Sequence, residues 1–174
     1  DKVDAKIDSI RLQYVDDVYG EAQQAGEGIF DLIDKFKEHP EVGVPLYGPI
    51  INTVTRGARL KKFYLRSAAS GVGKTRSMIA DACYVSCEKI YNESFGWIRI
   101  GTCQPALFIT TEQELEEVQT MMLAFLSNVN EDHILNGSYE GDEEDRVREA
   151  ATILAKAPLY VEELPDFSLK DVED

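Results

Sequence analysis

Apolar residues recur at helical spacing in the first part of the chain. Over residues 3–19 an apolar side chain returns every third or fourth position, with aspartate and lysine between, which predicts a helix with one apolar face. The pattern continues over residues 21–38, where Gly26 and Gly28 are expected to interrupt the helix. Pro40 is predicted to end it, because proline lacks the backbone N–H that a helix needs.

After a loop rich in proline and glycine at residues 40–50, short apolar runs alternate with amphipathic segments. Runs rich in β-branched and aromatic residues predict strands, and apolar residues at helical spacing predict helices. Residues 129–142, with Asn136-Gly137 and Gly141, are predicted to be a loop. The predicted strands are residues 63–65, 97–100, 106–110 and 159–161, and the predicted helices are residues 75–91, 113–128 and 143–156.

This order of strands and helices is typical of an α/β domain with a mainly parallel sheet. Parallel strands need connections of about a dozen residues or more, and the predicted helices are long enough to supply them. Residues 1–39 are therefore predicted to be a helical arm or linker, and residues 40–174 the α/β domain. The chain begins at Asp1 without a methionine, so we expect it to be a piece of a longer protein.

The charge distribution singles out one segment. The 174 residues carry a formal net charge of −14, which argues against a nucleic-acid coat protein or a membrane-surface binder, since both are basic overall. Between Arg56 and Arg76, however, there are seven basic residues and no acidic one, so an anion is expected there. The seven are Arg56, Arg59, Lys61, Lys62, Arg66, Lys74 and Arg76.

The three cysteines are too few for a disulfide framework, and an odd number cannot all pair within one chain. Cys83 and Cys87 lie four residues apart on a predicted helix, but Cys103 and two distant histidines do not complete a metal site. Both helical cysteines are predicted to be small buried apolar side chains. The sequence has no apolar run of about 18 residues, and we expect no signal peptide. A reduced, cytoplasmic protein with no membrane partner is expected.

Residues 68–75 follow the phosphate-loop pattern Gly-x-x-x-x-Gly-Lys-Ser/Thr, with Ala68 in place of the first glycine. Glycines allow backbone N–H groups to surround phosphate oxygens, and the following helix directs its free N–H groups at the same anion. Lys74 is expected to reach the β- and γ-phosphates, and the Thr75 hydroxyl to hold Mg²⁺. The alternative is an ordinary glycine-containing turn at a helix start. The predicted nucleotide-binding residues are Ala69, Ser70, Gly71, Val72, Gly73, Lys74, Thr75 and Arg76.

Acidic residues follow two of the predicted strands. Glu112 comes after residues 106–110, at the carboxyl end where ligand sites of parallel sheets gather. A carboxylate there can orient or deprotonate a water molecule, although an exposed glutamate at a helix start is an alternative. Residues 159–163 end in Glu162 and Glu163. They fit either a Walker B strand that leads to a metal-linked acid or a strand followed by solvated acids, and the spacing leaves both open.

Together these motifs resemble the core of the DnaB-type replicative helicases. The resemblance rests on the phosphate loop, on residues 107–112 before a helix, on Asn136-Gly137, and on residues 157–163. It implies a RecA-like P-loop NTPase domain that uses ATP and Mg²⁺. It also implies that Glu112 is the catalytic base, with Lys74 as a further catalytic residue.

The same resemblance implies that residues 40–174 are the N-terminal part of an incomplete RecA-like domain. Residues 158–163 match the segment before the family's Walker B strand better than they match Walker B itself. The Walker B aspartate, the sensor strand, the DNA-binding loops and the arginine finger are then expected beyond Asp174. In the family that arginine comes from a neighbouring subunit of a hexameric ring, so this chain alone is expected to be inactive.

The resemblance therefore predicts the ATP-binding core of a bacterial or phage-encoded replicative helicase that couples ATP hydrolysis to DNA unwinding. Its expected partners are single-stranded DNA, further copies of itself in a ring, and a primase or loader. The N-terminal helices are expected to dock on a neighbouring subunit. Two alternatives stay open: a RecA-like ATPase with a regulatory or recombination role, and a non-catalytic interaction module with a vestigial nucleotide site. A small nucleotide kinase fits less well, because residues 130–149 are acidic and no arginine-rich lid is present.

Overall fold

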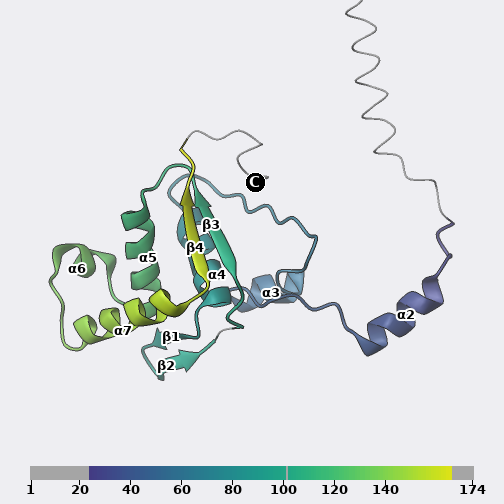
Figure 1. Ribbon diagram of the computed structural model, residues 1–174, viewed down its shortest axis with the longest axis horizontal. Coiled ribbons are helices and arrows are strands. Elements are labelled where there is room, and N and C mark those ends of the chain that lie inside the picture. Colours follow the sequence, from purple (N-terminus) through teal and green to yellow (C-terminus); the bar gives the residue numbers. More distant parts are fainter. Residues whose placement is uncertain (1–23, 101, 166–174) are drawn as a thin grey trace, which may run out of the picture. The chain divides into compact units, whose positions relative to one another are not determined.

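Figure 1 shows the computed structural model, which describes residues 24–100 and 102–165. The chain divides into two units after Pro40. The helix predicted over residues 3–19 lies outside the described residues.

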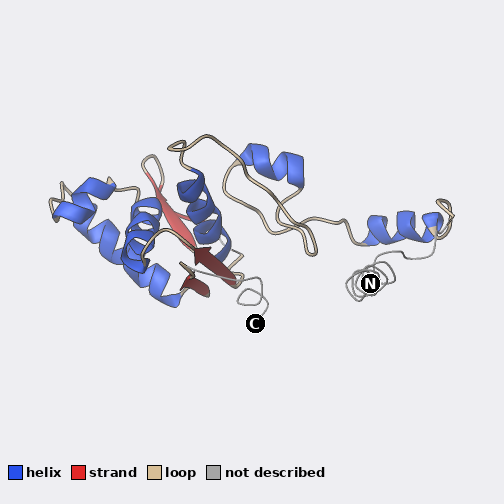
Figure 2. Cartoon of the chain, turned by 90° about the horizontal axis from the view of Figure 1, so that it is seen from above, coloured by secondary structure: helices blue, strands red, loops and turns tan. Residues whose placement is uncertain are grey.

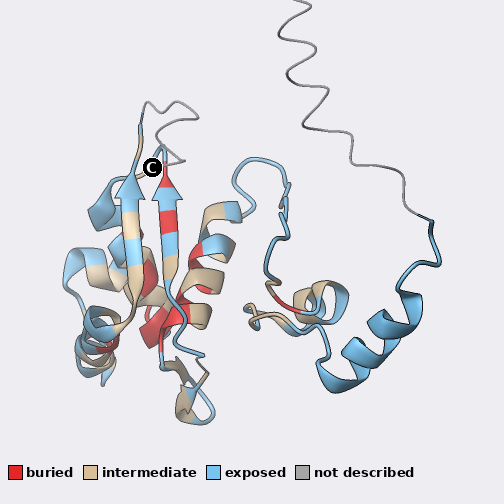
Figure 3. Cartoon of the chain, turned by 45° about the vertical axis from the view of Figure 1, so that its right-hand side comes forward, coloured by how far each residue is buried: buried red, intermediate tan, exposed pale blue. Residues whose placement is uncertain are grey.

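The first unit contains helix α2, Ile29–Glu38. It begins after Gly28, whose φ of 68° lies in the left-handed region that glycine adopts readily. Its last residue is Glu38, which is followed by the capping residue His39 and by Pro40. The structure thus confirms the predicted end, and the helix begins only after Gly26 and Gly28, where the sequence predicts an interruption. Every residue of α2 is exposed, including its large apolar side chains (Figure 3).

A pair of parallel strands lies at the centre of the second unit. β3, Ala106–Thr110, pairs in parallel with β4, Leu159–Glu163, along its whole length. In β3, Phe108 and Thr110 are buried, whereas Leu107 is 57% exposed, because successive side chains point to opposite faces. Both predicted strands and their parallel direction are confirmed.

Three helices form the core with this strand pair: two contact its strands, and the third packs mainly on one of these two helices (Figures 1 and 3). Their apolar side chains form one cluster with Phe108. The sequence predicts two of these helices at nearly their observed bounds, because apolar residues recur strongly along both. The three helices are α4, Lys74–Ser86, α5, Leu115–Ser127, and α7, Glu143–Lys156.

Leu126 tests how much this core contributes to stability. Its side chain is fully buried, so Leu126→Ala is expected to lower the free energy of unfolding by about 3 kcal/mol, because it removes apolar contacts and leaves a cavity. Leu135→Ala is the matched control at a residue that is 65% exposed, and it is expected to cost less than about 0.5 kcal/mol. Urea unfolding followed by circular dichroism measures both values. Equal losses for the two variants would contradict this account of the core.

An antiparallel hairpin follows α4. β1, Lys89–Asn92, pairs with β2, Gly96–Arg99, which confirms the strand predicted at residues 97–100. The helix predicted over residues 75–91 exists, but its predicted end is wrong, because α4 ends at Ser86. Isoleucine and tyrosine in β1 suit a strand as well as a helix. The hairpin decides between them, since its turn is closed by hydrogen bonds from backbone N–H groups to the Asn92 side chain.

Two predicted loops contain short helices. α3, Pro49–Thr55, begins inside residues 40–50, and α6, Glu131–Asn136, lies inside residues 129–142. Both helices are too short to show a repeating apolar pattern, so only their end signals were available in the sequence. In α6 these signals are the Asn130 side chain, which accepts a hydrogen bond from a first-turn N–H, and a glycine after the last residue.

The strand predicted at residues 63–65 is also wrong. These residues belong to the loop that joins α3 to α4 (Figure 2), and Phe63 is 89% exposed. A strand forms only where another strand pairs with it, and within the described residues no strand lies beside this segment. The described part of the chain therefore has an α/β fold with one parallel pair and one antiparallel hairpin, rather than the larger, mainly parallel sheet that the sequence predicts.

Candidate phosphate-binding site

The predicted phosphate loop leads directly into α4. Gly71 and Gly73 have φ angles of 77° and 90°, in the left-handed region, so a side chain at either position would strain the backbone. Gly73 immediately precedes the first turn of α4, which begins at Lys74. The free N–H groups and the positive end of the helix dipole therefore adjoin the loop, and both favour an anion.

Residues of this loop line a cavity of about 460 Å³. The cavity brings seven of the eight predicted nucleotide-binding residues together with Glu112. The eighth, Val72, is 68% exposed and does not line it. The lining residues are Ala69, Ser70, Gly71, Gly73, Lys74, Thr75, Arg76, Glu112, Gln113 and Met121.

The Lys74 ammonium group lies against the loop itself. Its Nζ donates hydrogen bonds to the carbonyl oxygens of Ala68 at 2.7 Å and Ala69 at 3.3 Å. The side chain is exposed, so an anion in the cavity can reach the same donors. The half-buried Thr75 follows it, in the first turn of α4.

The turn that carries Glu112 is held at the carboxyl ends of β3 and β4. The Thr110 hydroxyl accepts a hydrogen bond from the N–H of Gln113 at 3.0 Å. The carboxylate of Glu163, which lies opposite Thr110 in the strand pair, accepts one from the N–H of Leu115 at the start of α5. A negative charge is favourable at this end of a helix. The segment from Glu112 to Leu115 is therefore tied to both strands.

Glu162 and Glu163 are both exposed at the end of β4, as the interpretation with solvated acids expects. The carboxylate of Glu163 also has a role that neither interpretation includes, because it caps the start of α5. The sequence carries no signal for this contact, because the two partners are 48 residues apart and meet only through the pairing of β3 with β4.

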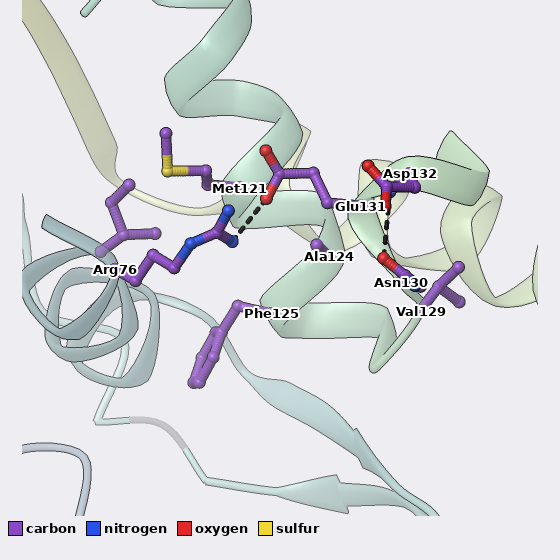
Figure 4. A pocket seen from close by; sticks show the side chains of 9 residues that line it. Arg76, Met121, Ala124, Phe125, Val129, Asn130, Glu131 and Asp132 are labelled. Carbon is purple, nitrogen blue, oxygen red and sulfur yellow. Dashed lines mark hydrogen bonds and ion pairs between the residues drawn. The ribbon is translucent and has the colours of Figure 1, made fainter. Parts of the chain in front are cut away.

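Arg76 is paired with an acid that sequence reasoning misses. One of its guanidinium nitrogens lies 2.5 Å from a carboxylate oxygen of Glu131, the first residue of α6 (Figure 4). Both residues line a second cavity, of about 510 Å³, whose remaining lining is largely apolar. Arg76 and Met121 line both cavities, so the ion pair lies between the phosphate loop and α6. The sequence predicts a loop where α6 lies. Without that helix, nothing in the sequence indicates that Glu131 lies beside Arg76.

α6 also carries a histidine–carboxylate pair. His133 Nδ1 lies 2.8 Å from a carboxylate oxygen of Glu143, the first residue of α7. This hydrogen bond raises the pKa of His133 above its ordinary value of 6.5, and the charges of Glu143, Glu140 and Asp132 act in the same direction. The pKa of Glu143 is lowered, first by a hydrogen bond from the Glu140 N–H and then by His133.

A loss of stability is expected as the pH rises past neutrality. Because the pKa of His133 is raised in the folded protein, its contribution is complete below its ordinary pKa and is lost as the pH rises through the folded value. Glu143 has a lowered pKa, so its contribution is lost only as the pH falls below 4.5. His133→Gln is expected to flatten the melting temperature between about pH 6 and pH 8. His39→Gln is the control, and the same flattening in that variant would contradict the assignment.

Cys83 and Cys87 are fully buried in the core, which confirms that they pack as small apolar side chains. A hydrogen bond with Cys87 and burial both raise the pKa of the Cys83 thiol well above its ordinary value. Within residues 24–100 and 102–165, no three or more His, Cys, Asp or Glu side chains gather in an arrangement that could hold a metal ion.

Comparisons with known proteins find a relative by sequence and several similar solved structures. No family model matches the chain. It is 41% identical over 151 residues to the SPbeta prophage-derived uncharacterized protein YorI of Bacillus subtilis (strain 168), a match that covers 86% of this chain and 30% of YorI. It is similar to the ATPase domain of G40P, with a TM-score of 0.64 and 13% identity over 87% of this chain and 50% of that one. It is also similar to a DnaB-like replicative helicase, whose structure was described together with its interactions with primase. That match has a TM-score of 0.65 and 13% identity, and it covers 98% of this chain and 38% of the helicase.

One of these neighbours is an ATPase domain and the other is a DnaB-like replicative helicase, and this confirms the sequence resemblance at the level of the fold. The chain spans 30% of YorI and at most 50% of these two structures. In the described part of the chain, no helix is long and apolar enough to cross a membrane.

Proposed function

We propose that this chain is the ATP-binding core of a DnaB-like replicative helicase, and that the complete protein couples ATP hydrolysis to DNA unwinding. The observation that carries the proposal is the 460 Å³ cavity, which is lined both by the phosphate loop and by Glu112. A phosphate held by the loop would share this cavity with a carboxylate that can act on water. The structural likeness to DnaB-like helicase ATPase domains supports the same function.

In this proposal the loop and the start of α4 bind the triphosphate. No atom lies within 4 Å of the place where a Cβ would stand at Gly71 or Gly73, so the space beside both glycines is open, and the start of α4 favours negative charge. Lys74 would exchange its contacts with two loop carbonyl groups for oxygens of the β- and γ-phosphates. Arg76 would add a second positive charge at the side of the cavity, where Glu131 holds it.

The lining residues also fit a magnesium ion. Thr75 lines the same cavity, and its hydroxyl is an oxygen ligand of the kind that Mg²⁺ prefers. A bound Mg²⁺ would neutralise part of the phosphate charge. Thr75 would hold it, and Glu112 would orient or deprotonate the attacking water.

Hydrolysis and unwinding are proposed for the complete protein and not for this chain alone. The chain spans only 30% of YorI, and among the residues that the structure describes, Lys74 and Arg76 are the only basic residues that line the cavity. The proposal assigns the further arginine that the reaction needs to a neighbouring subunit of a ring. We also propose a cytoplasmic site of action in a bacterial host, which the prophage origin of YorI supports.

The exposed face of α2 supports self-association. Its large apolar side chains are 42% to 79% exposed, and an uncovered apolar stripe on a helix is typical of a docking surface. We propose that this helix docks on the next subunit of a hexameric ring that takes up single-stranded DNA and works with a primase or loader. Unchanged oligomerisation of the complete protein without residues 1–38 would contradict this part of the proposal. The apolar residues are Ile29, Phe30, Leu32, Ile33 and Phe36.

Calorimetric titration of the chain with Mg²⁺-ATP tests the function directly. Binding to one site per chain is the expected result. Absence of binding, both here and in the complete protein, would instead favour a non-catalytic module with a vestigial site. If binding is present, strand displacement by the complete protein separates a helicase from a RecA-like ATPase with a regulatory or recombination role.

A further inference from the structure

Arg66 lies immediately before the phosphate loop and is bound to the helix that follows the loop. One guanidinium nitrogen donates to Ser77 Oγ at 2.5 Å, and the other donates to Asp81 Oδ2 at 2.6 Å. Both acceptors belong to α4 and lie four residues apart, on one face of that helix. The planar guanidinium thus bridges two side chains at once.

Both acceptors make further contacts that extend this bridge. The Ser77 hydroxyl donates to the carbonyl oxygen of Lys74 at 3.1 Å, in the first turn of α4. The second oxygen of Asp81, Oδ1, accepts a hydrogen bond from the N–H of Tyr47 at 3.0 Å. The Asp81 side chain is only 16% exposed and that of Arg66 is 32% exposed, so water screens their attraction less than it screens a fully exposed pair.

The bridge fixes the end of the loop that α4 itself does not hold. At its far end the loop continues into α4, but at its near end residues 63–65 form no strand that would anchor it. Within the described residues, the other hydrogen bonds to this end of the loop come from Lys74, whose ammonium group donates to the carbonyl oxygens of Ala68 and Ala69. In the proposed function Lys74 leaves these carbonyl groups when it binds phosphate. Arg66 would then hold the near end of the loop against α4.

We propose that Arg66 is a positioning residue for the phosphate loop, acting through Ser77 and Asp81 and not by contact with the nucleotide. Arg66 does not line the 460 Å³ cavity, which sets it apart from Lys74 and Arg76 in the same basic segment. This inference rests on the proposed nucleotide-binding function. The sequence predicts only that the basic segment attracts an anion. In the structure, the charge of Arg66 is paired with the carboxylate of Asp81.

Two measurements on the whole chain test this inference. In the ligand-free protein, Arg66→Ala is expected to speed amide hydrogen exchange over residues 67–73. In titrations with Mg²⁺-ATP it is expected to weaken binding about tenfold, as loss of a supporting contact does at other binding sites. Arg66→Lys keeps the charge but cannot bridge both acceptors, so an intermediate loss is expected. Arg148→Ala is the control, because it removes an exposed arginine–glutamate pair on α7.

A double-mutant cycle distinguishes positioning from direct contact. Asp81→Asn is expected to weaken binding in the same direction as Arg66→Ala, and the double variant is expected to lose no more than Arg66→Ala alone, since both changes break one contact. Additive losses, or unchanged binding and exchange in Arg66→Ala, would overturn the inference. If circular dichroism shows that Arg66→Ala is unfolded, Asp81→Asn decides alone. If neither the wild-type chain nor the complete protein binds Mg²⁺-ATP, the proposed function fails, and the exchange rates still decide the role of Arg66.

Discussion

Replacement of Lys74 by alanine is expected to weaken Mg²⁺-ATP binding about a hundredfold. The ammonium group lies at the wall of the cavity and is the charge that the phosphate loop offers to the β- and γ-phosphates. Hydrogen bonds to charged groups are each worth about 1.5–3 kcal/mol, and about 2.7 kcal/mol corresponds to a hundredfold change in affinity. The variant is expected to fold normally, because the side chain is exposed and, within residues 24–100 and 102–165, its only hydrogen bonds are to two loop carbonyl groups.

Calorimetry on the wild-type chain and on the variant measures this effect. Lys156→Ala is the matched control, because Lys156 is an exposed lysine at the end of α7 and does not line the cavity. Binding by Lys74→Ala at wild-type affinity would mean that ATP binds elsewhere or that the loop is an ordinary turn. Equal losses in Lys74→Ala and Lys156→Ala would point to a general effect of net charge rather than to a phosphate site.

The elements that the sequence predicts well are those whose signal is local. β3 and α7 have strong apolar patterns with clear ends, and the structure places them within two residues of the predicted bounds. Residues 63–65 have an equally apolar composition, yet they form no strand, because pairing depends on a partner that the local sequence does not contain. The predicted end of α4 is wrong for the same reason. The residues that follow α4 form β1, which pairs with β2 in a hairpin.

The candidate site divides in the same way. The phosphate loop is one continuous stretch, so its residues can be recognised from spacing, and Glu112 follows from the rule that ligands gather at the carboxyl ends of parallel strands. The structure brings both to one cavity, while their roles in binding and catalysis stay predictions. The supporting contacts of Arg66, Arg76 and Glu163 cannot be predicted from the sequence. Each joins residues on different elements, and only the folded chain determines which acid meets which base.

Glu112→Gln is expected to separate binding from hydrolysis in the complete protein. The glutamine side chain has nearly the same size, so the cavity and the phosphate loop are expected to keep their shape and their affinity for Mg²⁺-ATP. It cannot accept a proton from water, and loss of a general base typically lowers kcat by about a hundredfold to ten-thousandfold. The experiment therefore measures kcat for ATP hydrolysis beside the calorimetric Kd on the same preparation.

Glu117→Gln provides the control, because Glu117 is an exposed acid in the first turn of α5 and lies outside the cavity. It removes the same charge from the same helix end, so any general electrostatic effect on the site appears in both variants. A fall in kcat confined to Glu112→Gln, with Kd unchanged, would assign the base to Glu112. If kcat is unchanged in Glu112→Gln, the base lies elsewhere in the complete protein, and Glu112 is an exposed helix-start residue that happens to border the phosphate loop.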